Sequence, residues 1–129
     1  MTALDTHTWI FWVNDSLDEL SPKALESIQS HDVLGVSIIS CWEIAMLVAK
    51  NRLRLNIDVL SWIDQALKYP GVKLLNLNPE ITVLSTRLPG NFHGDPADRL
   101  IVATCMYNNI PLISKDKKIH SWGNINIIW

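Results

Sequence analysis

The 129-residue sequence has few cysteines, no excess of basic residues and no long hydrophobic run. Its two cysteines, Cys41 and Cys105, lie in segments with helical pattern. A disulfide-stabilised secreted domain carries more cysteines and places them in loops, so we expect reduced thiols and a cytoplasmic location. The net charge of −2 excludes a protein held on nucleic acid by bulk positive charge, but not one that binds nucleic acid locally.

Membrane attachment and secretion are not expected either. The apolar stretch 9–13 is too short to span a bilayer, and Asp5 precedes it rather than a basic segment. No repeat, low-complexity segment or long linker interrupts the chain. Because 48% of the residues are hydrophobic, the chain can bury a core, and we expect residues 1–129 to form a single domain.

Apolar runs of strand length alternate with segments of helical period. The strand-like runs are MTAL, VLGVSII, VKLLNL, PLIS and NINIIW. Their order, β-α-α-β-α-α-β-α-α-β-α-β, predicts an α/β fold with a three-layer α/β/α arrangement around a central parallel sheet of four to five strands. Such sheets carry their sites at the carboxyl ends of the strands.

Local signals mark several helices. Ser21–Pro22 and Asn78–Pro79 each pair a capping residue with a proline suited to the first helical position. In the segment 58–68, the residues Leu60, Ile63 and Leu67 recur at helical spacing and predict one apolar face.

Four acidic residues are candidates for that sheet edge. Asp5 directly follows the first strand, and Asp116 follows PLIS after one intervening residue. Glu43 is expected in the first turn of the helix after the second strand. Asp98 is expected in the first turn of the helix that leads into PLIS, where topology alone does not fix its place.

Each acid also has a purely structural interpretation. Ser40 and Glu43 fit a capping box, and Asp95 with Pro96 and Asp98 fits a helix start with an acidic third position. Asp5 and Asp116 could cap the helix or turn that follows them. Such caps stabilise a helix by about 1 kcal/mol and require no function.

Together the four acids suggest a metal site. Carboxylates gathered at one place raise each other's pKa unless a cation neutralises them. Oxygen ligands without a nearby pair of His or Cys ligands favour Mg²⁺ or Mn²⁺ over Zn²⁺. Such ions activate water and stabilise the charge that develops in phosphodiester hydrolysis.

Three stretches resemble the PIN-domain ribonucleases, and most nearly the VapC toxins of bacterial and archaeal toxin–antitoxin pairs. They are LDTHTWIFW near the start, VSIISCWEIAMLVAKNRLRL from Val36 and HGDPADRLIVATCMYNNIPLISKD from His93. The resemblance covers nearly the whole chain, although residues 58–89 match only in pattern. It implies a single PIN domain and a metal-dependent endoribonuclease. By the same resemblance, attack by an activated water is expected to leave a 5′-phosphate and a 3′-hydroxyl.

The resemblance also implies roles for individual residues. Its acidic positions match Asp5, Glu43, Asp98 and Asp116, which we take as catalytic residues and as ligands of Mg²⁺ or Mn²⁺. Asp5, Asp98 and Asp116 would bind the ion directly or through water, and Glu43 would orient water or a second ion. Outside these four, Thr6 and Ser114 could hydrogen-bond the carboxylates, and Asp95 could contribute through a water.

Other polar residues receive weaker assignments. His7 and His93 lie near the acids in sequence, but the resemblance requires no histidine and we give them no role. Arg99 could pair with a carboxylate, contact an RNA phosphate or form a structural ion pair. The basic clusters 50–54 and 115–118 are either solvated helix ends and turns or phosphate contacts. Asn51 stands where the family usually has glycine, and asparagine tolerates the left-handed backbone expected there.

The resemblance implies two protein partners besides RNA. One is a second copy of the chain, joined through apolar residues of the early helices. The other is a cognate antitoxin, for which exposed aromatic residues could form a docking surface. Trp9, Trp12 and Trp42 are candidates, although a tryptophan is more often part of the core than of an interface.

Three other interpretations remain open. A phosphotransfer protein with Asp5 as nucleophile would need a second acid two residues later, where His7 stands, and a receiver domain would need an acidic pair near the first strand. A non-catalytic interaction module would use the acids only as caps. A PIN-fold nuclease could also act in RNA processing or repair instead of as a toxin.

Overall fold

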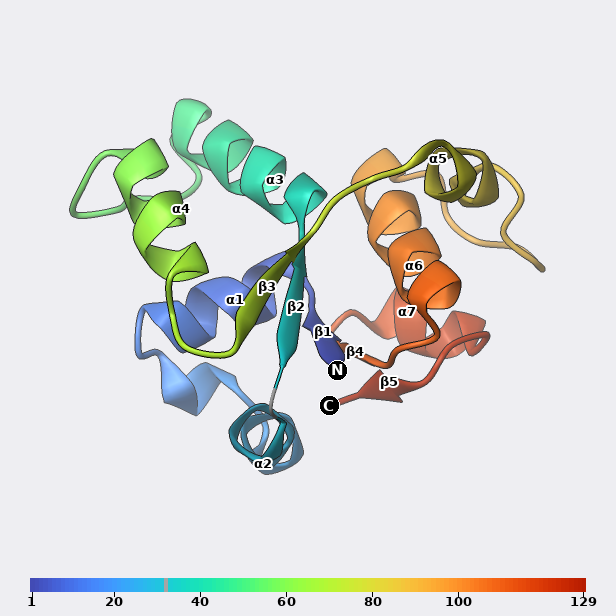
Figure 1. Ribbon diagram of the computed structural model, residues 1–129, viewed down its shortest axis with the longest axis horizontal. Coiled ribbons are helices and arrows are strands. Elements are labelled where there is room, and N and C mark those ends of the chain that lie inside the picture. The colour runs from blue at the N-terminus through green and yellow to red at the C-terminus, as the bar shows by residue number, and fades with distance from the viewer. Residues whose placement is uncertain (32) are drawn as a thin grey trace.

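A computed structural model of the chain describes residues 1–31 and 33–129. Helices and strands alternate along it in the predicted order (Figure 1). The strands are β1 (Thr2–Leu4), β2 (Leu34–Ser37), β3 (Val72–Leu75), β4 (Leu112–Ile113) and β5 (Ile127–Ile128). The helices are α1 (Thr6–Val13), η1 (Leu17–Glu19, a 3₁₀ turn), α2 (Pro22–Ser30), α3 (Ile38–Ala49), α4 (Val59–Leu67), α5 (Pro79–Ser85), α6 (Pro96–Asn108) and α7 (Lys117–Trp122).

The five strands form one parallel sheet in the order β3-β2-β1-β4-β5. Leu4 of β1 pairs with Val36 of β2 and with Ile113 of β4. This register aligns the carboxyl ends of the three central strands, so the residues that follow them meet at one edge of the sheet.

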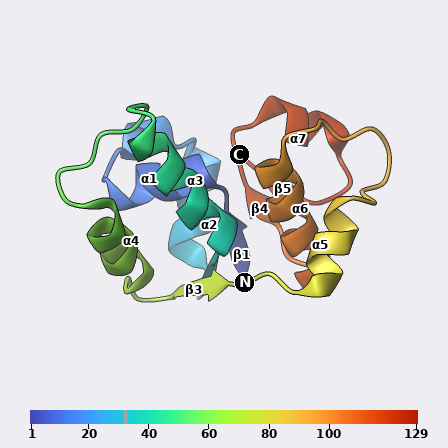
Figure 2. The ribbon, with the colours of Figure 1, turned by 90° about the horizontal axis from the view of Figure 1, so that it is seen from above.

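Helices cover both faces of the sheet. In Figure 1, α1, α2 and α4 lie on one side of the strands, and α5, α6 and α7 lie on the other; Figure 2 shows the same two groups of helices from above. Neighbouring strand residues therefore enter different cores: Leu4 and Ile113 join the core under α1 to α4, whereas Ala3 and Leu112 join the core under α5 to α7. The alternation explains why these short strands are apolar throughout, and the predicted three-layer α/β/α fold is confirmed.

Side-chain caps fix the helix starts where the sequence predicts them. Ser21 accepts a hydrogen bond from the Ala24 amide, and Asn78 accepts one from the Ile81 amide. The turn after α3 also has the expected backbone, because Asn51 has a φ of 57°. These caps and this turn depend on residues close together in sequence, and the structure confirms each of them.

The apolar face predicted for α4 is confirmed only in part: Ile63 and Leu67 are partly buried and pack against the core, but Leu60 does not. Leu60 is 63% exposed, whereas Trp62 and Ala66 are buried. Both sets of residues have helical spacing, but Trp62 offers the larger apolar surface, packs edge-on against Trp9, and its indole N–H donates to Asn14 Oδ1 at 3.0 Å. The helix therefore turns the tryptophan inward.

The three tryptophans proposed for a partner surface differ in their exposure to solvent. Trp9 is fully buried in the core, so it is not available for docking. Trp12 is half-buried and packs against Tyr69, while Trp42 on α3 is 56% exposed. None of the helices in the described part of the chain combines the length and apolar character needed to cross a bilayer.

The two cysteines are free thiols within helices, as expected. Cys41 is partly buried on α3, and Cys105 is buried on α6. Burial, with a smaller contribution from the charge of Asp5, raises the pKa of Cys105 to about 12. This thiol therefore stays protonated and acts as a small apolar side chain of the core.

Candidate active site

Asp5 lies where β1 ends and α1 begins. Its backbone is extended, and its Oδ1 accepts a hydrogen bond from the Thr8 amide at 2.9 Å, which caps the helix. The structural interpretation of Asp5 is therefore correct, yet its carboxylate also lines a pocket at the carboxyl edge of the sheet. One residue holds the helix start and faces the candidate site at the same time.

Asp116 repeats this arrangement beyond β4. Its Oδ1 accepts from the Lys118 amide at 2.8 Å and from the Ile119 amide at 3.4 Å, which caps α7. Ser114, which is fully buried, accepts a hydrogen bond from the Asp116 amide at 3.1 Å. No hydrogen bond joins Ser114 to a carboxylate among the described residues; Ser114 instead holds the backbone of Asp116, the residue whose carboxylate lines the pocket.

Glu43 is positioned differently from the prediction. The helix begins at Ile38 with Ser37 as its cap, because the apolar residues Ile38 and Ile39 belong to the helix and not to the strand. Glu43 consequently lies in the second turn, and the predicted capping box with Ser40 does not form. An apolar run of this length fits either a buried strand or a helix, so its pattern could not fix the boundary.

Thr6 connects Glu43 to the first helix. Its hydroxyl donates to Glu43 Oε1 at 2.5 Å and lies 2.9 Å from the hydroxyl of Ser40. Thr6 and Ser40 are both buried. Because a hydroxyl has a single proton, Ser40 acts as donor in the second contact. The predicted contact between Thr6 and a carboxylate is confirmed, and it fixes the side chain of Glu43 across two helices.

Asp98 and Asp95 lie together at the start of α6. Asp95 Oδ1 accepts from the amides of Ala97 at 2.9 Å and Asp98 at 3.2 Å, so Asp95 is the cap that the sequence predicts. Asp98 Oδ2 lies 2.7 Å from His93 Nε2. His93 was given no role from the sequence, and only its short spacing to Asp98 in a loop before a helix could have suggested this contact.

Arg99 faces away from the acids. Its Nε donates to the carbonyl of Ser85 at 2.9 Å, and one terminal nitrogen donates to the carbonyls of Phe92 at 3.0 Å and His93 at 3.1 Å. The guanidinium also lies 5.7 Å from the centre of the Phe92 ring. The predicted pair with a carboxylate is therefore not made within the described residues: Arg99 holds the loop that carries His93.

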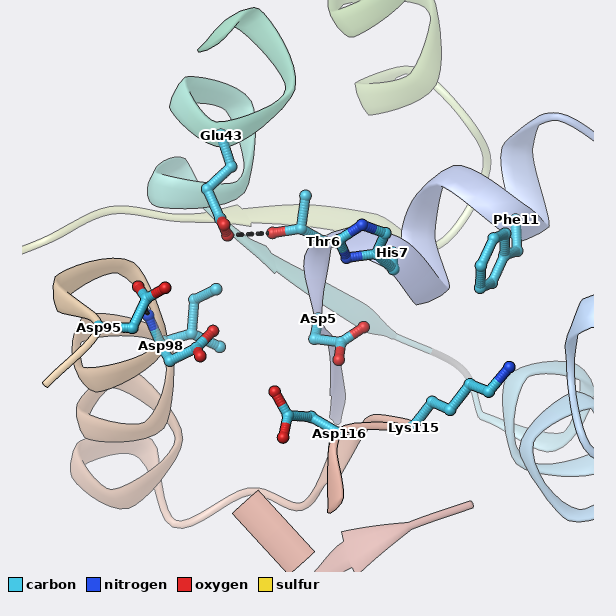
Figure 3. A pocket seen from close by; sticks show the side chains of 10 residues that line it. Asp5, Thr6, His7, Phe11, Glu43, Asp95, Asp98, Lys115 and Asp116 are labelled. Atoms are coloured by element: carbon cyan, nitrogen blue, oxygen red, sulfur yellow. Dashed lines mark hydrogen bonds between the residues drawn. The ribbon is translucent and has the colours of Figure 1, made fainter. Parts of the chain in front are cut away.

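The predicted acids line one pocket of about 430 Å³. Figure 3 shows Asp95 and Asp98 on one side, Glu43 above them, and Asp5 and Asp116 nearer the middle. Topology did not fix the place of Asp98, and the structure brings it to the other three. The pocket is also lined by residues to which the sequence assigned no role or for which it left two roles possible, namely His7, Phe11, Ile101 and Lys115. The signal for Phe11 is its spacing on α1, one helical turn after His7.

Burial and repulsion from neighbouring carboxylates act on Glu43 and on Asp98. Burial raises the pKa of Glu43, the hydrogen bond from Thr6 opposes this rise, and the charges of Asp98 and Asp95 add to it. Burial likewise raises the pKa of Asp98, the hydrogen bond from His93 opposes it, and the charges of Asp95 and Asp116 add to it. The site therefore holds negative charge that the chain itself does not neutralise.

Replacement of Glu43 by glutamine should raise the stability of the metal-free protein. A raised carboxyl pKa means that the folded state holds its proton more tightly, so this contribution to stability is complete at low pH and is lost as pH rises through the raised pKa. At neutral pH we expect Glu43→Gln to gain on the order of 1 kcal/mol in urea unfolding with EDTA. The gain should shrink on acidification.

The exposed Glu26 of α2 supplies the control for this measurement. Glu26→Gln removes the same charge away from the pocket, and it should leave the free energy of unfolding nearly unchanged. Equal effects of the two substitutions, or a loss of stability in Glu43→Gln, would contradict the repulsion described above.

The donor set suits a hard divalent cation. Each carboxylate uses one oxygen for a bond within the protein: Oδ1 of Asp5, Asp95 and Asp116, Oε1 of Glu43 and Oδ2 of Asp98. The second oxygen of each has no protein donor among the residues that the structure describes, and oxygen ligands are those that Mg²⁺ and Mn²⁺ prefer.

The same carboxylates are not packed as a closed metal cage. Within residues 1–31 and 33–129, no three His, Cys, Asp or Glu side chains are close enough together to hold an ion as they stand. Repulsion between carboxylates opposes such closeness in the absence of a cation. Binding would therefore draw the side chains inward or leave waters between them and the ion, as Mg²⁺ commonly does.

A parallel α/β sheet with acids gathered at its carboxyl edge defines a class of protein with an acidic site suited to divalent cations. Residues 2–123 match the PIN domain family, and the chain belongs to that family. The chain is also 36% identical over 118 residues to Ribonuclease VapC22 of Mycobacterium tuberculosis, a match that covers 92% of this chain and 88% of that protein.

Solved structures share the fold at lower identity. VapBC2 from Rickettsia felis, bound to a DNA fragment from its promoter, superposes with a TM-score of 0.69 at 19% identity, covering 98% of this chain and 96% of that one. DNA-bound VapBC from Salmonella typhimurium gives a TM-score of 0.70 at 13% identity, covering 98% and 97%. These likenesses support the architecture described above.

Proposed function

We propose that this chain is a metal-dependent endoribonuclease that hydrolyses RNA phosphodiester bonds. The observation that carries the proposal is the pocket in which Asp5, Glu43, Asp98 and Asp116 meet at the carboxyl edge of the sheet. The similarity to Ribonuclease VapC22 supports RNA as the substrate. Residues 1–129 would act as a single domain.

Mg²⁺ or Mn²⁺ bound at the acids would supply an activated water and neutralise charge on the phosphate. Asp5, Asp98 and Asp116 would hold the ion, directly or through water, and Glu43, fixed by Thr6, would orient water or a second ion. His93 would keep Asp98 in place. Hydrolysis would then proceed without a covalent intermediate, because the acids act as ligands and not as nucleophiles.

The test is cleavage of labelled RNA by the purified chain. We expect cleavage with Mn²⁺ or Mg²⁺, and no cleavage when EDTA replaces the ion. Product ends should carry a 5′-phosphate and a 3′-hydroxyl. Cleavage that persists in EDTA would contradict the need for a metal ion. Ends that carry a 2′,3′-cyclic phosphate would contradict attack by water, because they arise when the neighbouring 2′-hydroxyl attacks the phosphate.

We further propose that the nuclease is the toxin of a type II toxin–antitoxin pair and acts in the cytoplasm as a homodimer. VapBC complexes share its fold. Apolar side chains are available for partners, because Trp42 on α3 and Leu60 on α4 are 56% and 63% exposed.

Expression of the chain should arrest growth, and a small protein encoded beside it should relieve the arrest. Growth unaffected by an active nuclease would oppose the toxin role, and a monomeric mass in light scattering would oppose the dimer.

A further inference from the structure

The acidic pocket extends beyond the carboxylates into a part of different chemistry. Figure 3 shows Phe11 and Lys115 on the side of the pocket away from Asp95 and Asp98, with Asp5 between the two sides. Phe11 comes from α1 and Lys115 from the turn between β4 and α7, and both line the same pocket. An aromatic ring and a cation thus lie next to the place where the ion would bind.

Lys115 is available for an anion. Its side chain is exposed, and within the described residues it forms no ion pair with any carboxylate. Among the lining residues described, it is the only lysine or arginine. Arg99, the nearby alternative, donates to three backbone carbonyls and faces away. A phosphate group in this pocket would therefore meet Lys115 as its cationic side chain.

The ring of Phe11 is available for stacking. Phe11 is half-buried against the core and contributes to the pocket wall, while His7 one helical turn earlier is exposed. Their ring centres are 6.3 Å apart and their planes are tilted by 50°, so the two rings do not cover each other face to face. Such a ring offers a platform for a flat nucleobase.

We propose that Phe11 and Lys115 form a nucleotide subsite, in which one base of single-stranded RNA packs on the Phe11 ring and an adjacent phosphate pairs with the Lys115 ammonium. This inference rests on the proposed nuclease function and defines how the same site positions its substrate. A single strand is required, because a base within a duplex remains stacked on its neighbours and cannot reach a ring inside a pocket. The subsite offsets the repulsion that the carboxylates exert on the RNA backbone.

Binding can be tested without cleavage by fluorescence anisotropy in EDTA. The probes are fluorescein-labelled single-stranded oligoadenylate and an abasic oligomer with the same ribose-phosphate backbone. Phe11→Leu should weaken oligoadenylate binding about tenfold or more but leave binding of the abasic oligomer unchanged, and Phe11→Tyr should restore it. Lys115→Gln should weaken binding of both probes and lower the salt dependence of log Kd by roughly 0.7.

Matched controls are available on exposed residues outside the pocket. Tyr107→Leu removes an exposed ring from α6, and Lys23→Gln removes an exposed lysine from α2. Both should leave the affinity for oligoadenylate unchanged. The subsite is overturned if the parent protein binds neither probe, if Phe11→Leu affects both probes equally, or if Lys115→Gln leaves the salt dependence unaltered.

Cleavage kinetics with Mn²⁺ separate this inference from the function on which it rests. Relative to the parent protein, Phe11→Leu should raise KM for RNA with little change in kcat, because the ring would contact a base away from the reacting bond. RNA cleavage with unaltered KM in both variants would leave the nuclease standing and overturn the subsite. Base-dependent binding through Phe11 without any metal-dependent cleavage would support the nucleotide subsite and contradict the proposed nuclease function.

Discussion

Asp5→Asn is expected to lower metal-dependent RNA cleavage by at least about a hundredfold while the fold is retained. The substitution removes the charge of a proposed metal ligand that lies near the middle of the acidic pocket. Asparagine caps helices about as well as aspartate, so the bond from the Thr8 amide to the side-chain oxygen can persist. Initial rates on labelled RNA with Mn²⁺, compared with circular dichroism and urea unfolding of the same preparations, measure both effects.

Asp58→Asn is the control for this variant. Asp58 caps α4 in the same manner, with Oδ2 accepting from the Leu60 amide at 3.1 Å, and it does not line the acidic pocket. Asp58→Asn should therefore cleave RNA at the parent rate. Full activity in Asp5→Asn would refute the assignment of the site, and unfolding of Asp5→Asn alone would show that the charge itself is needed for the helix start.

Binding of Mn²⁺ is expected to raise the melting temperature substantially. A ligand that binds only the folded state contributes about 2.7 kcal/mol when present at a hundred times its Kd. For a chain of 129 residues, this corresponds to a rise on the order of 10 °C. A bound cation would also offset the charges of the neighbouring carboxylates, which together with burial raise the pKa of Glu43 and of Asp98. Differential scanning calorimetry with Mn²⁺ and after EDTA treatment measures the shift.

Asp116→Asn shows whether this stabilisation comes from the acidic pocket. The substitution preserves an oxygen for the amides of Lys118 and Ile119, and it removes one ligand charge. Most of the shift with Mn²⁺ should be lost in this variant. An equal shift in variant and parent, or the same rise with NaCl of matched ionic strength, would locate the effect outside the proposed site.

The sequence predicts those parts of the site that depend on topology and on local capping. Asp5 and Asp116 could be placed because each follows a parallel strand, and parallel strands bring their carboxyl ends to one edge. Asp95 could be recognised as a cap because Pro96 occupies the first helical position. The cap bonds lie within three residues of the side chain, and the shared sheet edge follows from the alternation of strands and helices along the chain.

Contacts between distant segments could not be predicted in the same way. Glu43 takes its position from Thr6, which is 37 residues away in sequence. Arg99 binds carbonyls in a loop whose path no pattern indicates. On α3, nearly every residue is apolar, so neither the helix start nor the direction of Glu43 follows from a contrast between polar and apolar positions.

Asp5 and Asp116 each cap a helix and also line the acidic pocket. This pair of roles has a consequence for sequences that descend from this one. At positions 5 and 116, asparagine or serine could replace aspartate and still cap the helix. If these carboxylates hold the ion as proposed, loss of activity by this route would carry little cost in folding, and a lineage released from selection for its chemistry could keep the same architecture. A stable fold is then poor evidence of a surviving enzyme in such relatives, and the residues at these two positions are the better guide.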